Sequence, residues 1–232
     1  MCGTRSTNSL HHCSKSFNTT GGDLRDEETK AAVELLIATN GGSVYRERLR
    51  ELVPGIGERF GSVGWIAVRA IPFMNADFKN SMAAAAQSYK STLDEELSKN
   101  PYGVPIATGT WGGSHQVAAL AVRMYLLNRW FPEIIGSEYT LRGLDYVLGR
   151  HPTSNVSYVS TVGTKSKLIA YGNNRADYSF IPGGIIPGVV IVQPDFPELK
   201  DDWPFLWFEN EYVVDTVTNF ILTTGAANAL AK

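Results

Sequence analysis

Apolar residues recur with helical spacing along most of the chain. In the segment that starts at Glu27, Ala31, Leu35 and Ala38 recur with helical spacing, and Ala32 and Leu36 stand beside them. Gly-Gly then interrupts the pattern, and Ser43 is a suitable first residue for a second helix. With Gly and Pro as stop signals, the same spacing predicts helices over residues 27–38, 43–52, 63–71, 75–97, 116–130, 138–148 and 210–230.

Residues 151–202 form a long stretch without this periodicity. It is rich in Asn, Ser, Gly and Pro, and only its apolar run IIPGVVIV, residues 185–192, predicts a short strand. An irregular segment of this length inside a compact domain is usually functional. The pattern therefore predicts an all-α fold of antiparallel helix pairs, with long irregular loops that line one end.

The composition and net charge of the chain limit the kinds of partner that it can bind. The chain has 232 residues, of which 44% are hydrophobic, so it can form one domain with a sizeable core. We expect a flexible polar leader over residues 1–22 and a single domain over residues 23–232. A net charge of −2 without a basic stripe predicts no nucleic-acid partner, and no apolar run is long enough to predict a membrane span. No secretory signal is visible, and the sequence assigns no compartment.

Cysteine chemistry plays no part in this prediction. Cys2 and Cys13 are the only cysteines, both lie in the leader, and the chain has no CxxC motif. His11 and His12 stand beside Cys13, but we interpret this group as a flexible terminus rather than a metal site. The sequence predicts no metal and no cofactor.

The stretch WFENEY places two carboxyl groups among aromatic side chains just before the last apolar helix. With Asn210 as its cap, Glu211 lies in the first turn of that helix, where an acidic residue is ordinary compensation of the helix dipole. Glu209 is predicted to be solvated or paired with an arginine. The last helix, residues 210–230, is predicted to bury one face, formed by Val213, Val214, Val217, Ile221 and Leu222.

Four motifs occur in an order that resembles a known enzyme family. WGGSHQV is followed by YVLGRHPTSNVSYVSTVG, by an Asn/Arg/Asp loop that ends in a Pro-Gly turn, and by WFENEYVVDTVTNFILTTGAANAL. This order resembles the C-terminal half of glycoside hydrolase family 9, over residues 100–230. The resemblance implies part of an (α/α)6 toroid and inverting hydrolysis of β-1,4-linked glucans, with cello-oligosaccharides or β-glucosides as substrates.

Inverting hydrolysis needs one protonated carboxyl group and one carboxylate, about 6.5–9.5 Å apart. The resemblance implies that Glu211 is the general acid. Neighbouring tryptophans and Phe208 are expected to desolvate its carboxyl group and favour the protonated form, against the field of the helix N-terminus. Asp177 is a candidate for the base, and Asp195 is a second one. The implied substrate contacts are Trp111, His115, Arg175 and Trp207.

The same resemblance shows departures. The family takes its base from an Asp-Ala-Gly-Asp motif that this chain lacks, and Asn173 and Asn174 stand where its His-x-Arg loop has histidine. About half of the helices of a toroid are predicted, which indicates a truncated or atypical member. Two alternatives stay open: a non-catalytic carbohydrate-binding or structural remnant without the base, and a fragment whose exposed inner helix faces are covered in a homo-oligomer.

Overall fold

The computed structural model describes residues 24–108, 111–152, 154–167, 181–201, 203 and 206–232. The chain divides into two compact units, residues 1–78 and 79–232, and each is described by itself. The expected leader, residues 1–22, lies outside the described residues. The expectation of one domain over residues 23–232 stays a prediction.

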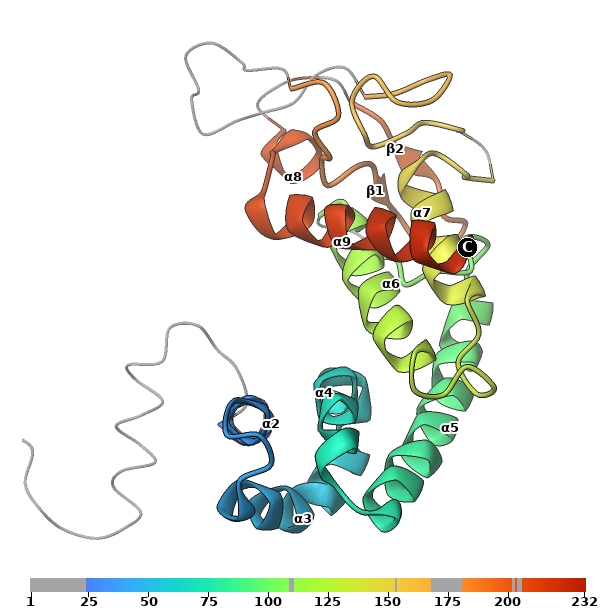
Figure 1. Cartoon of the computed structure of the whole chain (residues 1–232). Helices are drawn as coiled ribbons and strands as arrows, with labels where there is room; N and C mark the ends of the chain where they lie inside the picture. Colours follow the sequence, from blue (N-terminus) through green and yellow to red (C-terminus); the bar gives the residue numbers. More distant parts are fainter. Residues whose placement is uncertain (1–23, 109–110, 153, 168–180, 202, 204–205) are drawn as a thin grey trace, which may run out of the picture. The chain divides into compact units, whose positions relative to one another are not determined.

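The described residues of the first unit form helices joined by short turns (Figure 1). Helix α2 contacts α3, α4 and the 3-10 helix η1, so it is the centre of this unit. A partly buried ion pair joins α2 to the end of α3, with 2.6 Å between Arg59 Nε and Asp26 Oδ1. The elements are α2 (Leu24–Ala38), α3 (Ser43–Glu58), α4 (Phe60–Ala67) and η1 (Val68–Phe73).

Helix α3 is longer than predicted because it continues through Pro54. Proline removes one helical hydrogen bond and normally ends a helix. Here Leu49 and Ile56 are both fully buried and lie seven residues apart on one face, so continuing the helix buries a second large side chain. That burial offsets the cost of the proline.

The second unit is built on α6, which packs against both α7 and α9 (Figure 1). A two-residue antiparallel hairpin pairs Val190 with Leu199 and Ile191 with Glu198. The expected strand within IIPGVVIV is thus limited to two residues. The elements are α5 (Ala76–Ser98, whose first residues belong to the first unit), α6 (Ser114–Asn128), α7 (Glu138–Val147), β1 (Val190–Ile191), β2 (Glu198–Leu199), α8 (Trp207–Asn210) and α9 (Val214–Leu230).

Small side chains join the helices of this unit. Thr140 on α7 donates a buried hydrogen bond to the carbonyl of Ala121 on α6 (3.0 Å), and Thr223 on α9 donates to the carbonyl of Ala118 (3.1 Å). A side-chain hydroxyl can reach a neighbouring helix backbone only when two helices approach closely. The small residues at these crossings therefore set the packing of α7 and α9 on α6.

The predicted inner face of the last helix is wrong. Val214, Ile221 and Leu222 are 80%, 62% and 52% exposed, and among the five predicted side chains Val217 packs against the buried core. The inward face instead carries small residues that let α9 approach α6: Thr216, Thr223, Ala226 and Ala227. Close backbone packing has displaced the larger side chains to the surface.

The irregular segment contributes core rather than only surface. Tyr158, Ile185 and Ile186 are fully buried and pack with Tyr146 at the end of α7. The prediction of an all-α fold with long irregular loops is confirmed. None of the helices in the described part of the chain is both long and apolar enough to cross a membrane.

Candidate active site

Three loops meet at the N-terminal end of α6, and we call this place the loop junction: residues 111–114, 186–188 and 207–211. The backbone N–H of Gly112 donates to Phe208 O (3.0 Å), and that of Gly188 donates to Glu209 O (3.1 Å). Ser114 donates from its N–H to Pro187 O (3.1 Å) and from Oγ to Ile186 O (2.7 Å). These bonds fix the one-turn helix α8 against the start of α6.

Glycine is required at two points of this junction. A Cβ atom on Gly112 would lie 2.4 Å from the carbonyl group of Pro187. Gly188 has a φ of +91°, and a Cβ there would lie 2.6 Å from the ring of Tyr158. Any larger residue would separate the loops or strain the backbone. Close packing of the loops therefore explains why glycine occupies these positions in WGGSH and IPGV.

Two of the predicted sugar contacts come together here. The rings of Trp111 and Trp207 pack edge to face, with centroids 5.0 Å apart and an interplanar angle of 73°. Trp207 remains 49% exposed, so the pair presents aromatic surface to solvent. Exposed aromatic faces of this kind are suited to stacking on sugar rings. His115 lies in the first turn of α6, half-buried, four residues after Trp111.

Glu211 is placed differently from the prediction. It follows α8 in extended backbone (φ −81°, ψ 133°), and its N–H donates to Trp207 O (3.0 Å). Helix α9 starts only at Val214, so the expected position in its first turn, capped by Asn210, is wrong. The acidic residue that receives the field of the α9 N-terminus is Asp215. Glu211 is half-buried and lies four residues after Trp207.

Glu209 is the buried carboxylate of this stretch, which corrects the expectation that it is solvated or paired with an arginine. Its side chain is 2% exposed, and Oε2 lies 3.5 Å from Nζ of Lys167, itself 3% exposed. The backbone N–H of Asp201 donates to the same oxygen (3.2 Å), while Lys167 Nζ donates to Asp201 O (2.8 Å). Burial raises the pKa of Glu209, and the Lys167 ammonium opposes this rise.

Asn210 is fully buried and completes the anchoring. Its Nδ2 donates to the carbonyls of Trp203 (3.0 Å) and Asp201 (3.4 Å), so the orientation of the amide is settled by two acceptors. Its Oδ1 has no hydrogen-bond partner among the described residues. Asn210 therefore holds the loop before α8 rather than capping α9.

The remaining predicted site residues are not brought to this place by the described structure. Asp177 and Arg175 lie outside the described residues. Asp195 is exposed in the turn between β1 and β2. Within the described ranges, no three His, Cys, Asp or Glu side chains gather in a way that would hold a metal ion.

A second polar network, which sequence reasoning missed, is centred on His151. Its Nε2 lies 2.8 Å from Tyr146 O, which can only accept, so Nε2 carries a hydrogen. Its Nδ1 lies 3.1 Å from Ser154 Oγ and 3.7 Å from Glu198 Oε1, to which Tyr102 donates its hydroxyl hydrogen (3.0 Å). Burial alone would raise the pKa of Glu198, but the neighbouring polar side chains of His151, Ser154 and Tyr102 outweigh it and lower this pKa to about 2.

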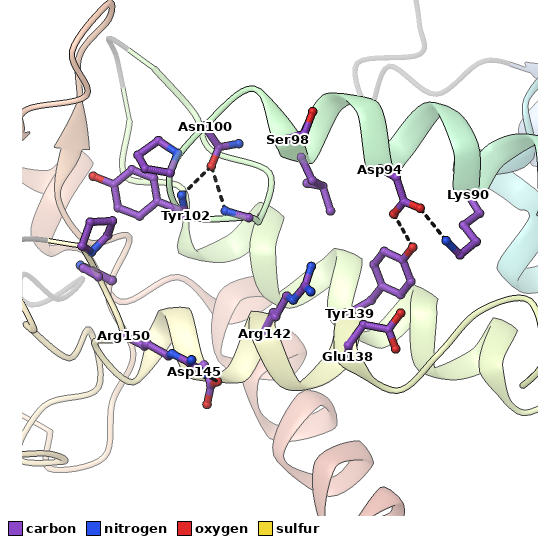
Figure 2. A pocket seen from close by; sticks show the side chains of 15 residues that line it. Lys90, Asp94, Ser98, Asn100, Tyr102, Glu138, Tyr139, Arg142, Asp145 and Arg150 are labelled. Carbon is purple, nitrogen blue, oxygen red and sulfur yellow. Dashed lines mark hydrogen bonds and ion pairs between the residues drawn. The ribbon is translucent and has the colours of Figure 1, made fainter.

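An open groove of about 890 Å³ lies elsewhere, between the C-terminal half of α5 and α7 (Figure 2). None of Trp111, His115, Trp207 and Glu211 lines it. We take the loop junction, not this groove, as the candidate active region, because it combines a half-buried carboxyl group with exposed aromatic rings on firmly bonded loops.

Comparison with solved structures gives the fold a counterpart. A Zn-binding triple mutant of the GH family 9 endoglucanase J30 superposes with a TM-score of 0.66 at 23% identity, over 87% of this chain and 42% of that one. The chain has the fold of part of a family 9 endoglucanase. The predicted resemblance and the predicted partial (α/α)6 toroid are thereby confirmed as a matter of fold.

Two further structures agree. AaCel9A in complex with cellobiose-like isofagomine has a TM-score of 0.63 at 18% identity, over 89% of this chain and 44% of that one. A single mutant of the thermostable endoglucanase from Alicyclobacillus acidocaldarius has a TM-score of 0.62 at 17% identity, over 88% and 44%. The chain thus spans less than half the length of these enzymes. No protein-family model matches it, and no curated protein matches it.

We expect the Lys167–Glu209 pair to stabilise the junction. Lys167→Met or Glu209→Gln leaves a buried partner without its counter-charge, and each should lower the free energy of unfolding by about 3–5 kcal/mol in urea titrations. The double variant should cost less than the sum of the two single variants by at least about 1 kcal/mol. Strict additivity would mean that the two side chains do not interact.

The Glu198 network predicts a pH dependence. Because the pKa is about 2 in the folded chain and about 4.3 in the unfolded chain, the carboxylate stabilises the fold above about pH 4.3. This contribution, on the order of 3 kcal/mol, is lost as the pH falls from 4.3 towards 2. Between about pH 6 and about pH 3, the free energy of unfolding should therefore decrease more in the wild type than in Glu198→Gln. The exposed control Glu133→Gln should follow the wild type, and equal slopes in all three would contradict the assignment.

Proposed function

We propose that this chain is the C-terminal part of a glycoside hydrolase that cleaves β-1,4-glucosidic bonds in cellulose-like glucans, cello-oligosaccharides or β-glucosides. The observation that carries the proposal is the position of Glu211 directly after the anchored α8, whose half-exposed first residue Trp207 packs against Trp111. The likeness in fold to endoglucanases, one of them in complex with cellobiose-like isofagomine, supports the choice of substrate.

Glu211 acts in this proposal as the proton donor to the leaving oxygen. A general acid must reach solvent and substrate while its backbone stays fixed. Glu211 meets this requirement, because the residue is half-buried and the backbone before it is held by the bonds from Gly112 and Gly188. Glu209 does not meet it, because its carboxylate is buried against Lys167 and is withdrawn from any substrate. Of the two acids in FENEY, only Glu211 therefore suits the role.

Trp207 and Trp111 supply the proposed stacking surface, with His115 as a hydrogen-bonding group at its edge. Arg175 is proposed as a further substrate contact, and Asp177 as the base that activates water on the opposite sugar face. Inversion requires about 6.5–9.5 Å between the acid and the base. The Asp177 carboxylate would have to reach that distance from Glu211.

One specific observation favours a second candidate function. The chain contains no Asp-Ala-Gly-Asp motif, yet it keeps the aromatic pair and the anchored loops. A carbohydrate-binding remnant without the base would have these properties. It would bind cello-oligosaccharides and leave them intact.

Hydrolysis by Glu211→Gln tests the main proposal. On cellotetraose, the variant should lose about 10²–10⁴-fold in kcat, as expected for loss of a general acid. On an aryl β-glucoside with a dinitrophenolate leaving group, the loss should be much smaller, because this group departs without protonation. Proton NMR of the first product should show the α-anomer if the reaction inverts.

Controls separate this outcome from a folding defect. Glu133→Gln changes an exposed carboxyl group in the turn between α6 and α7 and should keep wild-type turnover. Asp177→Asn and Asp195→Asn, made separately, should identify the base, and unchanged turnover in both removes Asp177 from the proposal. If the wild-type chain is inactive but still binds cellotetraose in calorimetry, the carbohydrate-binding remnant replaces the enzyme as the proposed function.

Self-association is part of the proposal, because α9 exposes an apolar face formed by Val214, Ile221 and Leu222. Such a face is a common association surface. Light scattering should give more than the monomer mass of 25.4 kDa, and Ile221→Glu should return the chain to a monomer. A wild-type monomer at millimolar protein concentration would contradict this part of the proposal.

A further inference from the structure

The open groove between α5 and α7 has a lining that points to one class of ligand (Figure 2). One wall is the segment from Lys90 to Ser98 on α5, and the other runs from Glu138 to Asp145 on α7. The turn at residues 100–103 and residues 150–152 close one end. The groove is long and open rather than enclosed, which suits an extended chain more than a compact cofactor.

The positive and negative charges of the groove are balanced. This balance excludes charged polymers as preferred ligands. Its cations are Lys90, Arg142 and Arg150, and its anions are Asp94, Glu138 and Asp145. A nucleic acid needs an excess of cations, and a strongly basic partner needs an excess of anions. Leu97 is the one aliphatic side chain among the described lining residues, so a lipid-like ligand is excluded as well.

Donors and acceptors stand side by side along the walls. Lys90 Nζ lies 2.5 Å from Asp94 Oδ2, and Arg150 Nη1 lies 2.6 Å from Asp145 Oδ2. Each pair leaves further N–H groups and carboxylate lone pairs for a ligand. A hydroxyl group both donates and accepts, so neighbouring hydroxyls of a sugar match such paired groups.

Arg142 stands between these two pairs and points from α7 across the groove towards α5 (Figure 2). Its guanidinium has no hydrogen-bond partner in the part of the chain that the structure describes. At the closed end, Tyr102 and the rings of Pro101 and Pro152 offer apolar faces. Polar walls with ring faces at one end are the combination that a sugar chain requires.

We propose that this groove is a second, non-catalytic binding site for a neutral glycan chain, and specifically for a β-1,4-glucan. The choice of a β-glucan rests on the proposed function, whereas the match to a polyhydroxylated chain rests on the groove alone. The groove would hold a strand of substrate away from Glu211 and so raise the local concentration of cleavable bonds.

Amide NMR spectra of the isotopically labelled full chain with Glu211→Gln, titrated with cellopentaose, test the proposal. We expect shifts in residues 90–103 and 138–152 in addition to shifts at the loop junction. Arg142→Ala and Asp145→Ala should each weaken binding at the groove amides about tenfold, the effect of one lost charge-assisted hydrogen bond. Arg129→Ala, at the exposed end of α6, is the matched control and should leave both sites unchanged.

The outcomes separate the groove from the catalytic proposal. Shifts confined to the junction overturn the groove and leave the proposed function standing. If the wild-type chain has no hydrolytic activity but the groove amides shift and Arg142→Ala removes these shifts, the groove proposal is supported and the proposed catalysis fails. An absence of shifts at millimolar sugar, or saturation of the groove by a charged peptide but not by cellopentaose, overturns the groove proposal.

Discussion

The anchoring of α8 is the constraint on which the candidate active region depends. A helix of four residues has no stability of its own, because nucleation costs more than one turn returns. Contacts from distant segments hold it instead: Gly112 and Gly188 donate to its carbonyls, and Lys167 meets its buried carboxylate. Trp207 begins this turn and Glu211 follows it, so the positions of both residues depend on the bonds that hold Phe208 and Glu209 between them.

Burying an ion pair costs desolvation free energy, and apolar side chains of similar volume would stabilise the loop as well. Our interpretation is that Lys167 and Glu209 contribute specificity of assembly. The Lys167 ammonium requires acceptors at Asp201 O and at the Glu209 carboxylate together, so only one arrangement of the three segments satisfies it. Apolar packing would tolerate several registers and would leave Glu211 less defined. The stability tests of the pair bear on the strength of this link, not on catalysis.

The helices were predictable where apolar spacing alone forms them, as in α2, α5, α6 and α7. The break between α8 and α9 was not. In a continuous helix, Phe208 O and Glu209 O would accept from the amides four residues later. They accept instead from Gly112 and Gly188, which are far away in sequence, and the chain from Glu211 to Val213 leaves the helix. Trp111, Trp207 and Glu211 could be named from a motif, whereas Lys167 lies in an irregular stretch with no periodic signal. Glu209 had one signal, its place among aromatic residues, and the helical pattern concealed it.

The groove and the loop junction share a support, although they share no lining residue. Tyr102 at the closed end of the groove packs edge to face on His151, with ring centroids 5.9 Å apart, and His151 lies 4.9 Å from the ring of Tyr158. Tyr158 in turn covers Gly188, whose N–H bonds to α8. Contiguous packing alone does not establish energetic coupling between two sites. It does separate two kinds of residue: a change within the His151 network should disturb both places together, whereas a change at the exposed Arg142 reaches the groove alone. Binding at the groove can therefore be removed without moving the loops that carry Glu211.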